Sequence, residues 1–177
     1  MNIVKVKNVV KTIERHPVEI LGNDYRVKIE YRNVKVMELN VYEDTIKITL
    51  QNKFKGVNNE KMLDFAINKM YNAIAKVEIE RAMEKTRLML GFAPEDYKIE
   101  SLNNEFYKCK NGVITISPDI VQYNKVIINT TILQEFCKIK YRVNSANYKK
   151  ALQSGLVKYE KFKLGSLIYN SAKKVSA

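Results

Sequence analysis

The sequence has few of the residues that build most enzyme and metal sites. Its 177 residues include one histidine, two cysteines, six glycines, three prolines and no tryptophan. No P-loop, Gly-rich dinucleotide turn or Gly-x-Ser-x-Gly elbow is present, and six glycines leave little room for one. The histidine, His16, precedes Pro17 in an expected connecting segment without an ordered partner nearby, so we assign it no catalytic or metal role.

The two cysteines do not indicate a disulfide framework or a cysteine-based zinc site. Cys109 and Cys137 lie in unlike contexts without a paired spacing, which favours reduced, buried, apolar thiols. The chain also lacks an apolar run long enough to span a membrane, and its first seven residues do not resemble a secretory signal. We therefore expect a cytoplasmic protein without a membrane partner.

Negative charge is scarce at the C-terminal end. The net charge is +12, and residues 134–177 contain ten Lys or Arg against two glutamates. Clustered positive charge attracts phosphate-bearing or acidic partners, although a solvated lysine-rich surface is its commoner meaning. The possible partners are therefore nucleic acid or an acidic protein. The basic surface would comprise Lys140, Arg142, Lys149, Lys150, Lys158, Lys161 and Lys163.

Alternating and helical apolar patterns predict an α+β fold. Residues 25–32 and 46–51 alternate with the period of half-buried strands, and residues 36–42 are expected to form a hairpin with 45–50, so we expect an antiparallel sheet at the N-terminal end. Two helical stretches follow, over about 58–77 and then from Ile79 to Gly91. Asn111-Gly112 predicts a second hairpin.

The last third of the chain is predicted to be helical. A helix is expected from about Tyr123 to Tyr141, Asn144-Ser145 breaks it, and Ser145 caps a short helix before a last helical segment. We expect residues 1–24 to form an extension or edge strand, residues 25–170 a single domain, and residues 171–177 a frayed tail.

Residues 106–114 and 134–145 contain motifs that place the chain beside a known family. They resemble the YgjP-like predicted metal-dependent hydrolases, relatives of the SprT and Wss-type metallopeptidases. The run from Phe106 to Ile114 is similar to the family's Trp-Gly-Ser-Cys segment, its Gly turn and the strand after it. Gln134-Glu135-Phe136-Cys137-Lys138, followed by Asn144-Ser145, aligns without a gap with His-Glu-Leu-Cys-His and a later His-Ser. The resemblance covers roughly residues 25–162 and implies a zincin-like fold, with the N-terminal sheet packed against a long central helix.

The sequence departs from the family at the residues that would hold the metal. The resemblance implies three histidine ligands and a glutamate that acts as general base on zinc-bound water. The corresponding positions hold Gln134, Lys138 and Asn144, and only Glu135 is kept. Amide oxygens are weak zinc ligands and a protonated lysine is not a ligand at all, so we expect no cofactor and no zinc-dependent catalysis, with Glu135 vestigial.

Lys138 lies three residues after Glu135, within reach on a helix. Its ammonium group is expected either to occupy the place of the metal and pair with Glu135, or to point into solvent among Lys140, Arg142 and Lys149.

Three functions stay open from the sequence. The chain is a non-catalytic module that binds nucleic acid or a nucleic-acid-associated protein through its basic surface; or it is a decoy or inhibitor from a mobile element or phage that acts on a host protein; or it is an enzyme of other chemistry. The last would need a thiol site at Cys109 or Cys137, for which no histidine is at hand.

Overall fold

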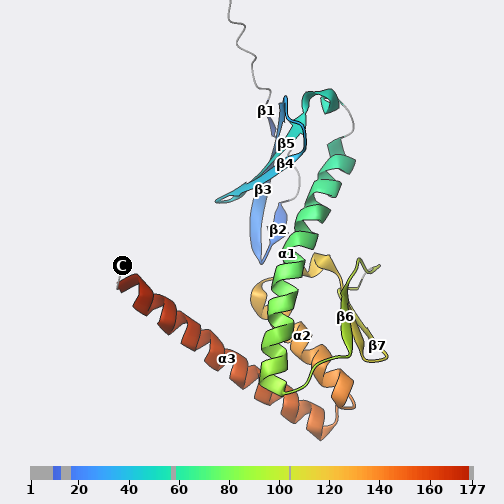
Figure 1. Ribbon diagram of the computed structural model, residues 1–177, viewed down its shortest axis with the longest axis vertical. Coiled ribbons are helices and arrows are strands. Elements are labelled where there is room, and N and C mark those ends of the chain that lie inside the picture. Colours follow the sequence, from blue (N-terminus) through green and yellow to red (C-terminus); the bar gives the residue numbers. More distant parts are fainter. Residues whose placement is uncertain (1–9, 13–16, 57–58, 104, 176–177) are drawn as a thin grey trace, which may run out of the picture. The chain divides into compact units, whose positions relative to one another are not determined.

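The structure is a computed structural model that describes residues 10–12, 17–56, 59–103 and 105–175 (Figure 1). His16 lies outside these residues, and side chains after Lys161 are not described. Within the described part of the chain no helix is both long and apolar enough to cross a membrane. The elements in chain order are β1 (Val10–Thr12), β2 (Val18–Ile20), β3 (Asn23–Arg32), β4 (Glu38–Tyr42), β5 (Thr45–Gln51), η1 (Asn52–Phe54), α1 (Asn59–Leu90), β6 (Asp96–Ile99), β7 (Tyr107–Lys110), β8 (Val113–Ile116), η2 (Pro118–Gln122), α2 (Lys125–Lys140) and α3 (Ala146–Val175).

These elements form two compact units, and the predicted α+β fold class is confirmed. Residues 1–74 and 121–124 make up the first unit, and residues 75–120 and 125–177 make up the second. The first half of α1 therefore belongs to one unit and the second half to the other. The single domain over residues 25–170 and the cytoplasmic location stay predictions.

The first unit is built on a mixed sheet with the order β1-β3-β5-β4, and β2 also pairs with β3 (Figure 1). The expected hairpin is present, because β4 pairs antiparallel with β5. The expectation of a wholly antiparallel sheet is wrong, because β3 and β5 are parallel. β5 lies between β3 and β4, parallel to β3 and antiparallel to β4. Apolar alternation predicts the strands but not which strand lies beside which.

Matched apolar side chains line this parallel pair. Val27 lies opposite Ile46, and Ile29 lies opposite Ile48. All four are buried, and Ile29 and Ile46 are completely inaccessible to solvent. Their burial on one face of the sheet is the main apolar contribution of β3 and β5 to the core of this unit.

The second unit contains a smaller sheet that repeats this strand arrangement. Its order is β6-β8-β7, with β8 parallel to β6 and antiparallel to β7. Asn111 and Gly112 connect β7 to β8 with φ of 50° and 75°. Two positive φ values in a two-residue loop are typical of the type I′ turn that Asn-Gly favours. The second predicted hairpin is therefore confirmed.

Helix α1 is one continuous helix, whereas the sequence analysis predicted two stretches. Between Val77 and Ile79 there is no glycine or proline to interrupt the backbone hydrogen bonds. The helix ends where predicted, since Gly91 takes a φ of 73° and its N–H donates to the carbonyl of Arg87.

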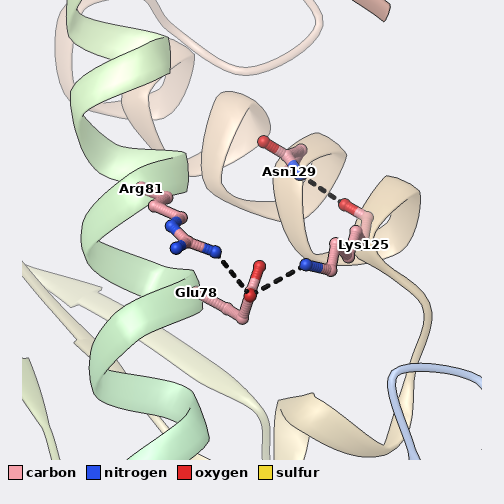
Figure 2. Close-up of polar contacts among 4 residues, drawn as sticks. All are labelled: Glu78, Arg81, Lys125 and Asn129. Carbon is pink, nitrogen blue, oxygen red and sulfur yellow. Dashed lines mark hydrogen bonds and ion pairs between the residues drawn. The ribbon is translucent and has the colours of Figure 1, made fainter. Parts of the chain in front are cut away.

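Ion pairs tie the start of α2 to the second half of α1 (Figure 2). The Glu78 side chain is only 12% exposed, and its Oε1 accepts hydrogen bonds from Lys125 Nζ at 2.9 Å and Arg81 Nη1 at 3.1 Å. Lys125 is the first residue of α2, where the helix dipole disfavours a positive charge. The Glu78 carboxylate offsets that effect and fixes the helix that carries the candidate site.

The connection from α2 to α3 is a tight turn. Asn144 takes a φ of 65°, a left-handed conformation that asparagine tolerates, and Ser145 Oγ accepts a hydrogen bond from the Tyr148 N–H at 3.1 Å. The predicted cap is thus confirmed. The helix it opens continues to Val175 instead of ending after a short segment, and it includes residues 171–175 of the expected tail.

Gly155 lies in the first half of α3 and allows its close approach to α2. A Cβ added there would lie 2.6 Å from Leu133 Cδ1, and Leu133 is 1% exposed. Glycine is unfavourable within a helix, but here its lack of a side chain permits the contact between the two helices.

Candidate functional site

The candidate site is built around Glu135, a buried carboxylate on α2 in the second unit. Glu135 is 2% exposed, and its Oε1 accepts a hydrogen bond from Lys138 Nζ at 2.6 Å. The two residues are one helical turn apart, and the Lys138 side chain is 30% exposed. The ion pair expected between them is present, and Lys138 does not simply point into solvent.

The strand β7 covers the same ammonium group. Lys138 Nζ lies 4.9 Å from the centroid of the Tyr107 ring, within the range of a cation–π interaction. Burial by itself would lower the pKa of Lys138, but the hydrogen bond and the negative charge of Glu135 outweigh it, and the pKa is raised from 10.5. The positive charge of Lys138 is therefore held firmly at neutral pH.

Both thiols near this ion pair are protonated at neutral pH. Burial raises the pKa of Cys109, and the Glu135 carboxylate raises it further while Lys138 acts in the opposite direction. Burial also raises the pKa of Cys137, which is fully inaccessible to solvent. Because the thiolate is the reactive form, neither cysteine is activated as a nucleophile.

The other two positions that resemble metal ligands lie in different surroundings. Gln134 is half-buried on α2. Asn144 is exposed, in the left-handed turn after the helix. Over the described part of the chain, no three His, Cys, Asp or Glu side chains are grouped so that they could hold a metal ion.

The seven residues of the predicted basic surface have different surroundings in the structure. Lys150, Lys158 and Lys161 line a common hollow of about 420 Å³ on α3, together with Gln153, Ser154 and Val157. Lys140 lies over the Phe92 ring, with its Nζ 4.7 Å from the centroid. The remaining three are distributed differently: Arg142 and Lys149 are exposed near the turn before α3, and the side chain of Lys163 lies outside the described residues.

A second hollow of about 360 Å³ lies between the end of α1 and β6. It is lined by carboxylates around apolar side chains such as Met83 and Phe136. One of the carboxylates, Glu84, accepts two hydrogen bonds from Arg87, both at 2.7 Å. Glu135 and Lys138 do not line this hollow, so it is separate from the ion pair.

Sequence reasoning missed the contacts that join distant segments. The Lys138 pairing follows from helix spacing, but Tyr107 lies about thirty residues earlier and carries no local signal. The role of Lys158 was missed for the same reason. Its Nζ donates to the carbonyl oxygen of Met89 at 2.7 Å.

A comparison with protein families finds one that extends over most of the chain. The model of the YgjP-like, metallopeptidase domain family matches residues 3–164. The resemblance seen in the sequence is thereby confirmed. No curated protein and no solved structure gives a match.

Replacing Lys138 with methionine should destabilise the protein by about 2 kcal/mol. Removal of one partner from a fully buried ion pair costs about 3–5 kcal/mol, and the partial exposure of Lys138 reduces the effect here. Chemical denaturation measures the difference. Lys149→Met, which removes an exposed lysine, is the matched control and should change stability by less than about 0.5 kcal/mol.

The loss in the Lys138→Met variant should come from the buried carboxylate that is left without a positive partner. A buried charge without a partner costs free energy that a neutral amide of the same shape does not cost. Adding Glu135→Gln to Lys138→Met should therefore recover much of the stability that the single variant loses. Equal stability of Lys138→Met and the original protein from pH 4 to 7 would contradict the role of the ion pair.

Proposed function

The chain belongs to the YgjP-like metallopeptidase-domain family, and from this premise we propose that it is a catalytically inactive member that serves as a binding protein. Its partner is nucleic acid or a nucleic-acid-associated protein, which it engages through the basic surface at the C-terminal end. The proposal has two parts, the loss of the metal site and the retention of a charged binding surface.

One observation carries the first part. One oxygen of the Glu135 carboxylate, the group that the resemblance makes the general base, accepts a hydrogen bond from the Lys138 ammonium group at 2.6 Å. A carboxylate that accepts a hydrogen bond from an ammonium group already has a counter-ion and has little tendency to take a proton from water. The ammonium supplies positive charge to the buried carboxylate without any metal.

The donor set at these positions does not fit zinc. Gln134 and Asn144 offer neutral amide oxygens, and the raised pKa of Lys138 keeps its nitrogen protonated and without a free lone pair. Glu135 is the only anionic donor among the four residues. We therefore derive no step of catalysis through a metal ion at this site.

The thiols give no support to an enzyme of other chemistry. Activated cysteines have a lowered pKa, and the surroundings of Cys109 and Cys137 act in the opposite direction.

The distribution of charge supports the second part. The structure groups Lys150, Lys158 and Lys161 around one hollow on α3, and the helix as a whole carries seven lysines and a single acidic residue, Glu160. Clustered lysines on one element favour polyanionic partners such as nucleic acid.

Zinc analysis tests the loss of the metal site. The purified protein should contain no stoichiometric zinc, and the triple variant Gln134→His, Lys138→His, Asn144→His should bind one zinc per chain and gain thermal stability with it, because the three positions regain imidazole donors. Asn68→His with Asn72→His is the control, since it places two histidines one turn apart on an exposed part of α1 without a third ligand. One tightly held zinc in the original protein would refute the proposal. Failure of the triple variant to bind zinc better than the control would refute the assignment of the three positions.

Retention on heparin tests the binding surface. The protein should bind heparin at low salt and elute steeply as salt rises, because binding releases counter-ions from the polyanion. Passage through the column without retention at low salt would contradict a polyanion-binding surface, and would direct attention to a protein partner captured independently of salt.

A further inference from the structure

We infer that the exposed lysine stripe of α3 binds the phosphate backbone of double-stranded nucleic acid, without base stacking. The lysine stripe consists of Lys150, Ser154, Val157 and Lys161, flanked by Gln153 and Lys158. The inference rests on the proposed function and narrows it to one element, one class of ligand and one mode of contact.

The lysine stripe has a shape and length that suit contact with a nucleic-acid duplex. Its four residues fall within about 60° of arc on a helix of 3.6 residues per turn. Lys150 and Lys161 stand on the same side of α3, about 16 Å apart along its axis. This separation corresponds to roughly five base pairs of duplex, at 3.4 Å per nucleotide of each strand. An α-helix is also narrow enough to enter the major groove of DNA.

The two outer lysines are available for phosphates. The structure gives neither Lys150 nor Lys161 a hydrogen bond or ion pair with any described residue, and both are exposed. No carboxylate lines the hollow of the stripe. Lys158 differs, because its Nζ donates to the carbonyl of Met89 in the last turn of α1 and so helps to hold α3 in place.

Other faces of α3 fix the helix within the second unit. Gly155 meets Leu133 on α2, and Lys85 Nζ lies 3.9 Å from the centroid of the Tyr159 ring. Figure 1 shows the first half of α3 beside α2 and the end of α1. Because these contacts anchor the helix, its lysines are held on a rigid element and lose little backbone entropy on binding.

The two aromatic side chains of α3 that the structure describes are buried, and this favours one form of nucleic acid. Proteins that bind single strands without sequence preference stack exposed aromatic rings on the bases. Tyr148 and Tyr159 on α3 are 9% and 7% exposed and are used in packing. A surface of lysines with buried tyrosines contacts phosphates alone, which favours a duplex, with its dense backbone charge, over a flexible single strand.

Binding to a short mixed-sequence DNA duplex and to the single strand of the same length tests the inference. Fluorescence anisotropy is measured for the full chain between about 50 and 200 mM salt. The original protein should bind the duplex more tightly than the single strand. The double variant Lys150→Gln, Lys161→Gln should lower the magnitude of the slope of log affinity against log salt by about 1.8. Over that range of salt, the affinity of the original protein for the duplex should fall by a factor about ten times larger than the affinity of this double variant does.

The matched control is Lys98→Gln with Lys110→Gln, which removes two exposed lysines from β6 and β7 and changes the net charge equally. Its salt slope should stay close to that of the original protein. Equal effects of the two double variants, or tighter binding of the single strand, would overturn the inference while leaving the proposed function in place. If the protein is retained on heparin but does not bind the duplex, the inference also falls. If it binds neither, the proposed nucleic-acid function falls with it.

Discussion

The ion pair between Glu135 and Lys138 is the interaction on which the interpretation of the second unit depends. A carboxylate that is 2% exposed is costly to bury unless it is paired with a positive charge or hydrogen-bonded. Here the lysine one turn later donates to Glu135 at 2.6 Å. The pair needs no ligand from another segment. Asn144, one of the positions that the resemblance aligns with a metal ligand, lies in a left-handed turn after α2.

Contacts from two other helices hold α2 in place. Glu78 of α1 anchors Lys125, the first residue of α2, through a hydrogen bond of 2.9 Å, and Gly155 lets α3 approach Leu133 of α2 closely. The opposite face of α3 carries exposed lysines. The unit thus combines an internally neutralised carboxylate with an external basic stripe.

The sequence predicted what local rules determine. Asn111-Gly112 encodes its own turn, Gly91 ends α1, and Lys138 follows Glu135 at helical spacing, so the second hairpin, the helix end and the ion pair could all be foreseen. It did not predict features that depend on distant neighbours. The parallel pairing of β3 with β5 joins strands that are not neighbours in the sequence, and Tyr107 meets Lys138 only because β7 lies near α2. The different contacts of the basic residues also depend on distant neighbours. Lys158 bonds to the Met89 carbonyl and Lys140 lies over the Phe92 ring, whereas Lys150 and Lys161 stay exposed on α3.

The titration of Lys138, followed through the NMR signal of its side-chain ammonium group, tests the central claim most directly. If Glu135 holds this ammonium in place of a metal, its pKa lies above the ordinary lysine value of 10.5 and its protons exchange with water more slowly than those of the exposed lysines. The stability that the pair contributes is then present below that value and is lost as the pH rises through the raised pKa. A pKa at or below 10.5, with proton exchange as fast as in an exposed lysine such as Lys149, would contradict the account.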